Sequence, residues 1–370
     1  MRRCFSALAM SLVGLVSSTI QAQSSDLVIA TVSPLTGTCA QDGTAIKNGA
    51  ELAADAINRK GGIKGRKIRV ISEDDRSDPK DAATVANKLV NNKEVLAVIG
   101  HYNSSCTLAA APIYNRAKVL ELSPGSTSPA VSKAGPYTAR VIVTDAAQGE
   151  FVSRWMVKDK GYKRIAVLFE NDDYGLGLKD VLMNKVPANG GQVVAVESYY
   201  LGETKDFNPI ITKIRGLNPD AVFIGGLYNE AALICKQASD VGWKPPFFGV
   251  DGLYSPALPT LGGAAVEGLR FAGFFHPDRQ SPIVQAYVKE FRTKYSKEPG
   301  TYDAFAYDAM CVIAAAINQG GASRQAIQQQ LRTLKVEGVT GTNEFDEHGD
   351  VKKNPLKLVV KGGKIVPSKD

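Results

Sequence analysis

Short apolar runs alternate with longer amphipathic segments along almost the whole sequence. The run 26–34 ends in turn residues, and the segment 43–62 has helical periodicity and stops at paired glycines. Further strands are expected at 67–75, 94–100 and 119–124, and further helices at 78–92 and 104–117. Because the strand runs are continuously apolar, they are expected to be buried on both faces. The pattern therefore predicts an α/β fold with parallel, doubly wound sheets.

The same unit repeats from about residue 145, and the length of 370 residues indicates about two domains. Four strands are expected in the repeat, at 164–170, 193–200, 221–226 and 246–250. In the tail, 268–275 is another expected strand and two helices follow it. The segment 356–367 is expected to be a hairpin that turns at Gly362 and Gly363. Periodicity alone does not assign these tail segments to one of the two lobes.

The N-terminal segment has the features of a secretory signal. Arg2 and Arg3 precede an apolar stretch, and small residues follow up to Ala22, after which we expect cleavage. Residues 1–22 would then be removed. No later run approaches the roughly 18 apolar residues of a membrane-spanning helix. The sequence thus predicts an exported, soluble protein.

Other functional classes receive little support. The formal net charge of +7 is spread along the chain without a long basic block, so nucleic-acid binding is not expected. His101, His276 and His348 lie far apart in the sequence and lack metal-ligand spacing. The chain contains no G-x-S-x-G motif. We therefore expect no enzymatic activity, no metal and no cofactor.

Four cysteines follow the signal segment, at positions 39, 106, 235 and 311. Export permits disulfides, and four cysteines allow three full pairings. Cys39 and Cys106 both lie just past strand ends, which makes them a candidate disulfide. The alternative is that they are buried thiols. Cys235 and Cys311 lie within helical patterns, which favours free thiols for that pair.

Polar segments follow the expected strands, and ligands bind open α/β sheets outside the carboxyl ends of strands. These segments are 33–43, 101–106, 123–129, 170–177, 225–230 and 250–256. In HYNSSC, Ser104 or Ser105 is placed to cap the following helix. The N-terminus of that helix suits an anion such as a carboxylate. The alternative is a helix cap without a ligand.

The segment SPGSTSP could complete such an anion site. Gly125 can expose its backbone, and Ser126, Thr127 and Ser128 supply hydroxyl groups. Hydroxyl-rich loops after two adjacent strands would converge on one small anion. The alternative is an ordinary turn.

In the second half of the chain, Asp251 ends a strand, where its carboxylate could pair with a ligand ammonium. The alternative is an Asp that belongs to a turn before Gly252. Tyr174 and Tyr228 could close over the ligand. Half-buried aromatic packing explains them equally well.

Several of these segments together resemble one known family. They are NGAELAADAINRKGGIKGRKI, DDRSDPKDAATVANKLV, VIGHYNSSCTLAAAPIY, LSPGSTSP, DYGLGL and DEHGD. The whole chain after the signal segment is similar to periplasmic branched-chain amino-acid-binding proteins of the leucine/isoleucine/valine type, the substrate-binding subunits of ABC importers. The resemblance implies two Rossmann-like lobes that are joined by three hinge crossings and close on a ligand.

The resemblance also implies a division of the chain into lobes. The first lobe would comprise 26–143 and 275–354, and the second 144–274 and 355–370. As a separate expectation, the family fold implies that the strand after Gly268 and the helices that follow it return to the first lobe. The last hairpin would belong to the second lobe.

The binding residues of the family fall on positions with suitable chemistry. The resemblance places the α-carboxylate site on Ser104 and Thr127, with backbone groups near Gly125 and Ser126. It places the ammonium-pairing acid on Asp251, where well-known members have Glu. The second-lobe aromatic residue falls on Tyr174, and a further aromatic position falls on either Leu227 or Tyr228.

Two departures from the family concern specificity and disulfides. Asp42 stands where leucine-binding members have an aromatic residue in the side-chain pocket. An acid there suits a purely aliphatic side chain poorly, because a desolvated charge is costly without a partner. The ligand implied is an amino acid or amino-acid-like molecule, including polar or basic amino acids and related amides. The disulfide positions of the family fall on Ser77 or its neighbour and Asn103, so that bridge is absent here.

The resemblance implies a monomer that binds a small ligand and delivers it to the membrane permease of an ABC importer. One alternative is a periplasmic receptor of the same fold that signals through a partner. A second alternative is an exported serine hydrolase, which needs a base near Ser104 or Ser126. Only His101 is close to these serines in the sequence.

Overall fold

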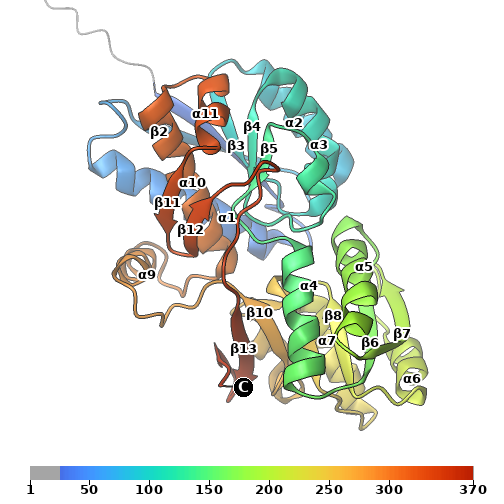
Figure 1. The fold of residues 1–370 in the computed structure, drawn as a ribbon. Coiled ribbons are helices and arrows are strands. Elements are labelled where there is room, and N and C mark those ends of the chain that lie inside the picture. The colour runs from blue at the N-terminus through green and yellow to red at the C-terminus, as the bar shows by residue number, and fades with distance from the viewer. Residues whose placement is uncertain (1–25, 370) are drawn as a thin grey trace, which may run out of the picture.

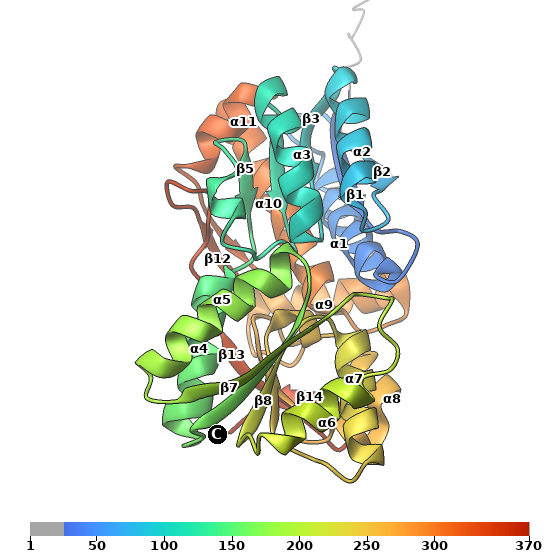
Figure 2. The same ribbon diagram turned by 90° about the vertical axis from the view of Figure 1, so that its right-hand side faces the viewer.

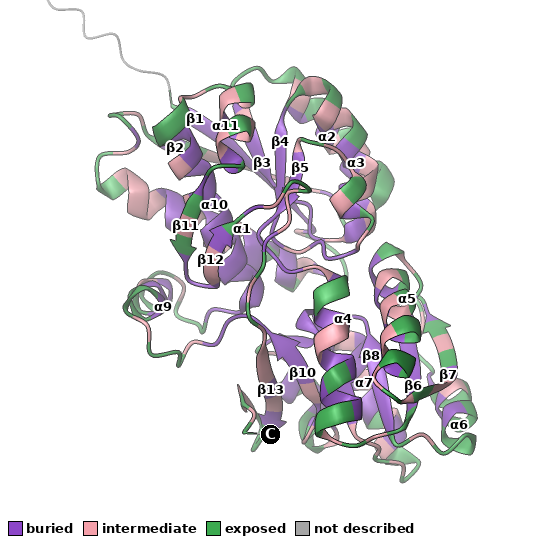
Figure 3. Ribbon diagram, viewed as in Figure 1, coloured by how far each residue is buried: buried purple, intermediate pink, exposed green. Residues whose placement is uncertain are grey.

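The computed structural model describes residues 26–369, so the predicted signal segment 1–22 lies outside the described residues. Strands and helices alternate as expected and build two lobes, each with its own sheet (Figure 1). The inner strands of both sheets are buried, whereas edge strands and the outer sides of the helices carry exposed residues (Figure 3). Within residues 26–369, no helix has both the length and the apolar character needed to cross a membrane.

The sheet of the first lobe is entirely parallel, with the strand order β2-β1-β3-β4-β5. Its strands are β1 Leu27–Ser33, β2 Ile68–Asp74, β3 Val95–Ile99, β4 Leu120–Ser123 and β5 Thr138–Arg140. The helices of this lobe are α1 Ala40–Arg59, α2 Pro79–Asn91, α3 Ser104–Ala117, α9 Pro282–Tyr295, α10 Thr301–Gly320 and α11 Arg324–Leu331. A small hairpin, β11 Lys335–Gly338 and β12 Gly341–Glu344, follows α11. All residues of β1 are buried, as expected for a strand covered on both faces.

Helices cover both faces of this sheet. The helices α2 and α3 pack on one face, and α1, α10 and α11 pack on the other (Figures 1 and 2). Gly49 of α1 lies against the backbone of α10, where a Cβ atom at position 49 would come within 2.0 Å of the Asp303 carbonyl oxygen. This close approach brings the N-terminal end of α10 to the lobe interface.

Gly49→Ala is therefore expected to lower the free energy of unfolding by about 2 kcal/mol, because the clash is with backbone and forces the two helices apart. Urea denaturation would measure the change. Gly216→Ala is the matched control. Gly216 ends the helix α6 Asn208–Gly216, and a Cβ atom there meets nothing within 4 Å, so alanine should stabilise the helix slightly. Equal midpoints for Gly49→Ala and the wild type would contradict the close packing of α1 against α10.

The sheet of the second lobe has the strand order β14-β13-β10-β9-β8-β6-β7. Its strands are β6 Arg164–Glu170, β7 Gln192–Tyr199, β8 Ala221–Gly225, β9 Phe247–Gly249, β10 Arg270–Gly273, β13 Leu356–Lys361 and β14 Lys364–Pro367. Its helices are α4 Asp145–Arg154, which continues as a π-helical turn Trp155–Asp159, α5 Asp173–Ala188, α6 Asn208–Gly216, α7 Tyr228–Asp240 and α8 Leu258–Gly262. Strands β6 to β10 are parallel, and β13 and β14 form the predicted antiparallel terminal hairpin.

The chain passes between the lobes in three places: after β5, after β10 and before β13 (Figure 1). The strand after Gly268 is β10, and it pairs with β9 and β13 in the second lobe. This pairing corrects the expectation that this strand returns to the first lobe. The crossing comes only after the strand has completed the second sheet, and α9 is the first element of the return.

The two cysteines of the candidate disulfide are free thiols in the structure. Both are buried, which corresponds to the alternative reading. Cys39 precedes α1 and packs in the main hydrophobic core, whereas Cys106 lies in the first turn of α3 and outside that core cluster.

The lobes are in contact across their interface. The Gln41 side chain donates to the Ser255 hydroxyl at 2.9 Å, and the backbone N–H of Asp173 donates to the Ser105 hydroxyl at 3.3 Å. Each bond joins the first lobe to the second. The described structure is therefore a closed arrangement of the lobes.

Candidate functional site

A cavity between the lobes collects residues from the carboxyl ends of both parallel sheets. Its lining residues are Tyr102, Asn103, Ser104, Gly125, Glu170, Tyr174, Leu227, Asp251 and Tyr302. Segments after β3, β4, β6, β8 and β9 contribute to this lining, as does the first turn of α10. This is the position expected for a ligand site in open α/β sheets. We call this cavity the cleft.

The N-terminus of α3 forms the first-lobe side of the cleft. The residue at the N-cap position is Asn103, which makes no side-chain cap hydrogen bond, so the expectation that Ser104 or Ser105 caps the helix is wrong. Ser104 is the first helical residue, and its buried hydroxyl oxygen accepts from the Ser128 backbone N–H at 3.2 Å. A helix start with free N–H groups favours an anion at this point.

The loop after β4 supports the start of α3. Gly125 lines the cleft, and a Cβ atom there would come within 2.7 Å of the Tyr102 ring, so glycine is needed for this approach. Ser126 and Thr127 are buried but do not line the cleft. The Ser126 hydroxyl lies 2.6 Å from that of Thr107, and the Thr127 carbonyl accepts from the Asp145 backbone N–H at 2.8 Å.

Arg140, at the end of β5, fixes the shape of this loop. Its guanidinium is fully buried and donates to the carbonyl oxygens of Ser126 at 3.1 Å and Ser128 at 2.9 Å. Its Nε lies 2.6 Å from Asp350, and it also bonds the Ser132 hydroxyl. Arg140 thus holds both carbonyls that flank Thr127 and ties them to the segment that includes Asp350.

Asp251 lies on the second-lobe side of the cleft and is almost fully buried. Its Oδ2 accepts from the Tyr302 hydroxyl of the first lobe at 3.4 Å, and its Oδ1 has no partner within the described residues. Burial raises the pKa of Asp251 to about 7. A ligand cation beside this carboxylate would restore its ionised form.

Two further second-lobe residues add acceptors and aromatic surface. Glu170 ends β6, and its Oε2 has no partner in the described part of the chain. Burial, followed by repulsion from Asp172, raises the pKa of Glu170 well above its usual range. Tyr174 lies in the first turn of α5 with its hydroxyl against Gly252, where a Cβ atom would come within 2.5 Å. None of the residues that line the cleft is cationic, so its charge favours a ligand with a positive group.

The structure decides between the two residues at the second aromatic position. Leu227 lines the cleft, whereas Tyr228 is buried in the core of the second lobe. Asp42 does not line the cleft either. Its Oδ2 accepts from the Tyr102 hydroxyl at 2.9 Å, and it faces an adjoining cavity.

The imidazole ring of His101 makes contacts that do not involve the serines of the site. Its ring is fully buried, with Nδ1 2.7 Å from Asp75 and Nε2 3.9 Å from Glu121. A serine nucleophile needs a base within hydrogen-bond reach. The Ser126 hydroxyl instead donates to the carbonyl oxygens of His101 and Tyr102. Among the described residues, no group of three or more His, Cys, Asp and Glu side chains is placed to hold a metal ion.

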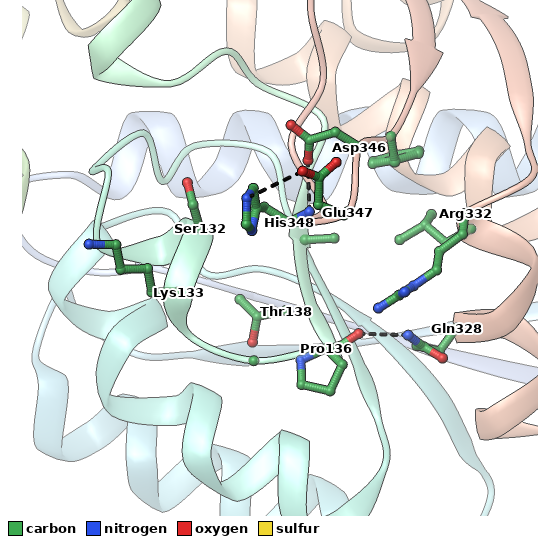
Figure 4. Close-up of a pocket in the computed structure, with 14 residues that line it drawn as sticks. Ser132, Lys133, Pro136, Thr138, Gln328, Arg332, Asp346, Glu347 and His348 are labelled. Carbon is green, nitrogen blue, oxygen red and sulfur yellow. Dashed lines mark hydrogen bonds and ion pairs between the residues drawn. The ribbon is translucent and has the colours of Figure 1, made fainter.

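A separate surface pocket of about 260 Å³ lies on the first lobe (Figure 4). It contains Lys133 and Arg332 together with Asp346 and Glu347, so its charges are mixed. His348 Nε2 lies 3.7 Å from Glu347 in the same loop. The pocket is built by one lobe alone, away from the cleft, and its charges favour no single class of ligand.

Sequence patterns did not identify Tyr102, Glu170 or Tyr302 as site residues, although all three line the cleft. Tyr102 and Glu170 lie within segments that follow strands, which was a usable signal. Tyr302 lies on α10, far along the sequence, and carried no such signal.

Comparisons with known proteins agree with this geometry. A family model described as "Periplasmic binding protein" matches residues 26–360. An "Amino acid binding protein" of Pseudomonas aeruginosa is 35% identical over 331 residues, which cover 88% of each chain. The crystal structure of the branched-chain amino acid transporter substrate-binding protein LivJ from Streptococcus pneumoniae, in complex with isoleucine, has a TM-score of 0.86 and 30% identity and covers 93% of this chain and 100% of that one. The leucine-binding protein LivK from Thermotoga maritima has a TM-score of 0.86 and 32% identity and covers 92% of this chain and 97% of that one.

Proposed function

This chain belongs to the periplasmic binding protein family, and from that premise we propose that it is the substrate-binding subunit of an ABC importer for an amino acid or amino-acid-like ligand. The observation that carries the proposal is the pair of opposed groups in the cleft. Ser104 at the start of α3 offers an anion site, and the buried carboxylate of Asp251 offers a cation site across from it. An α-amino acid carries an ammonium group and a carboxylate group on the same carbon atom.

The proposed mechanism is closure of the two lobes around the ligand. The first lobe would bind the α-carboxylate through Ser104 and the backbone near Gly125, with Ser126 and Thr127 shaping the loop. The second lobe would then bring Asp251 to the ammonium and Tyr174 over the ligand. Closure shifts the population toward the form that a permease can distinguish.

The remaining parts of the proposal concern location and assembly. Residues 1–22 are the proposed signal peptide, which would direct the mature chain to the periplasm. The mature chain would act there as a monomer. The proposed first lobe comprises 26–143 and 275–354, and the proposed second lobe comprises 144–274 and 355–370. No bond is made or broken in this function, so the protein would act without a cofactor and would not be an enzyme.

Ser104→Ala is expected to weaken amino-acid binding by about 1.5 kcal/mol, a rise in Kd of roughly tenfold, because a buried hydrogen bond to a charged group is lost. Isothermal titration calorimetry would measure the change. Ser72→Ala serves as the control, since Ser72 accepts from Thr31 within the β1–β2 pair and does not line the cleft. An unchanged Kd in Ser104→Ala would remove Ser104 from the proposed site.

Two alternatives differ in their partners and chemistry. A receptor of the same fold would signal through a partner, and regulator genes rather than permease and ATPase genes beside this gene would support that reading. A serine hydrolase has lost its support, because His101 contacts Asp75 and Glu121 instead of a serine hydroxyl. Turnover of ester or amide substrates that Ser104→Ala abolishes would restore it.

A thermal-shift screen across amino acids tests the proposed function. A ligand that binds only the folded protein raises the melting temperature by mass action, by an amount that grows with ligand concentration relative to Kd. We expect at least one L-amino acid to raise it in a concentration-dependent way. If no amino acid or amino-acid amide does so at millimolar concentration, the proposed ligand class is wrong.

A further inference from the structure

A second cavity, of about 200 Å³, adjoins the cleft and is lined by both lobes. From the first lobe, α1 contributes Asp42 and α10 contributes Thr301 and Asp303. From the second lobe, the segment after β9 contributes Tyr254 and Ser255. Because residues of both lobes form its walls, this space exists only when the lobes are closed. We call it the acidic chamber.

The acidic chamber and the cleft share a wall. Tyr302 lines both cavities. Tyr102 packs edge-on against Tyr302 with ring centroids 4.9 Å apart, and its hydroxyl donates to Asp42 inside the chamber. The two tyrosines therefore form the wall between the Asp251 side of the cleft and Asp42. A ligand that occupies both cavities would have to extend beside Tyr302.

The chamber contains buried acceptors without donors. The Thr301 hydroxyl and Oδ1 of Asp303 are buried and have no hydrogen-bond partner in the described part of the chain. Asp42 is 4% exposed, and its Oδ2 accepts from the Tyr102 hydroxyl. Buried polar groups are ordinarily satisfied, so the two unpaired atoms on Thr301 and Asp303 indicate a missing donor.

The charges of the chamber indicate the nature of that donor. Burial raises the pKa of Asp42 to about 7, with a further contribution from Asp303, and burial likewise raises the pKa of Asp303 to about 7. Lys297 and Glu298 also line the chamber, but both are exposed. Glu298 is paired with Arg292, and the positive charge of Lys297 offsets part of the rise in the pKa of Asp303. The buried part of the chamber thus presents two carboxyl groups and no cation.

We propose that the acidic chamber binds the distal end of the ligand side chain and selects amino acids with an ammonium or guanidinium group over aliphatic ones. Asp42 pairs with this cation, and Thr301 and Asp303 accept its remaining N–H groups. This inference rests on the proposed function, because it assumes that the α-amino and α-carboxylate groups of the same ligand occupy the cleft. The aliphatic specificity of similar proteins then does not extend to this chain.

Calorimetric titration with L-arginine, L-lysine and L-leucine tests this selectivity. We expect the wild type to bind arginine or lysine at least about tenfold more tightly than leucine, as for one buried charge-assisted hydrogen bond. Asp42→Asn keeps the shape of the side chain. In this variant the affinity for arginine or lysine, divided by the affinity for leucine, should fall by about tenfold or more. Wild-type binding of leucine as tightly as both basic amino acids would overturn the inference, as would an unchanged ratio in Asp42→Asn.

A second variant tests the same selectivity if Asp42→Asn fails to fold. Thr301→Val removes only a hydroxyl that no described residue uses, so the variant should fold, and the same ratio should fall by a few fold. Asp251→Asn separates the two proposals. If that variant loses leucine binding while the wild type shows no preference for basic amino acids, only the acidic chamber is wrong. If the wild type binds none of the three, the chamber proposal falls and the thermal-shift screen decides whether the proposed function stands.

Discussion

Asp251→Asn is expected to weaken binding of the amino-acid ligand by about 3 kcal/mol, which is a rise in Kd of roughly 150-fold. Asp251 Oδ1 is buried in the cleft and has no partner among the described residues. We expect this oxygen to accept a hydrogen bond from the ligand ammonium. Asparagine keeps the size of the side chain but removes the charge. The ammonium would then be buried without a counter-charge, which is costly.

Two controls separate loss of binding from loss of folding. The ligand-free melting temperature of Asp251→Asn should equal or exceed that of the wild type, because an incompletely paired buried carboxylate disfavours the folded state. Asp240→Asn, at the exposed end of α7 in the same lobe, should leave Kd within about twofold, since exposed charges contribute little. Calorimetric titration measures all three proteins. A Kd for Asp251→Asn equal to that of the wild type would show that the ammonium binds elsewhere.

Arg140→Met is expected to lower the free energy of unfolding by about 4 kcal/mol. The Arg140 side chain is fully buried and bonds Asp350 and the carbonyls of Ser126 and Ser128. Methionine fills a similar volume but leaves Asp350 Oδ1 and the carbonyl oxygens of Ser126 and Ser128 without the N–H groups of Arg140. Denaturant titration of the ligand-free protein measures the loss. The loop between the two carbonyls should also lose its fixed shape, so ligand affinity should fall as well.

The matched control is Arg292→Met. Arg292 forms a bidentate ion pair with both carboxylate oxygens of Glu298, each at 2.8 Å. The two side chains are 48% and 52% exposed. Exposed pairs of this kind contribute about 0–1 kcal/mol. If both variants lose the same free energy of unfolding, burial does not strengthen the contribution of the Arg140–Asp350 pair.

Local patterns predicted the elements of the fold well where strong periodicity met a clear boundary. The helix expected at 104–117 is α3, and the hairpin expected around Gly362 and Gly363 is β13 and β14. The first helix was less well placed: α1 is Ala40–Arg59 rather than 43–62. The two paired glycines lie beyond its end with positive φ values, so they terminate the helix from outside.

Patterns in single segments failed where the answer depends on another segment. Leu227 and Tyr228 are neighbours, and only the packing of α7 against the rest of the second lobe decides which one faces the cleft. Tyr302 reaches the cleft because α10 packs on α1 after a crossing that no local pattern encodes. Cys39 and Cys106 follow neighbouring strands, yet both remain free, buried thiols.

The positions that follow strands were the most informative signal for the site. Ser104, Gly125, Tyr174 and Asp251 all follow strands and all line the cleft, because parallel strands direct their carboxyl ends to one edge. Which of the remaining polar residues support the loops instead could be read only from the hydrogen bonds. Ser126 is the example, since its hydroxyl bonds the first-lobe backbone.

The central claim is that one ligand presents its carboxylate to Ser104 and its ammonium to Asp251. The most direct measurement is calorimetric titration of the wild type with the amino acid that gives the largest thermal shift, its methyl ester and its analogue without the amino group. The ester lacks the carboxylate charge, and the second analogue lacks the ammonium. We expect each analogue to bind at least about 100-fold more weakly than the amino acid. The ester removes the negative charge that Ser104 and the start of α3 would bind, and the second analogue leaves the buried Asp251 carboxylate unpaired. Retention of the full affinity by either analogue would contradict the central claim.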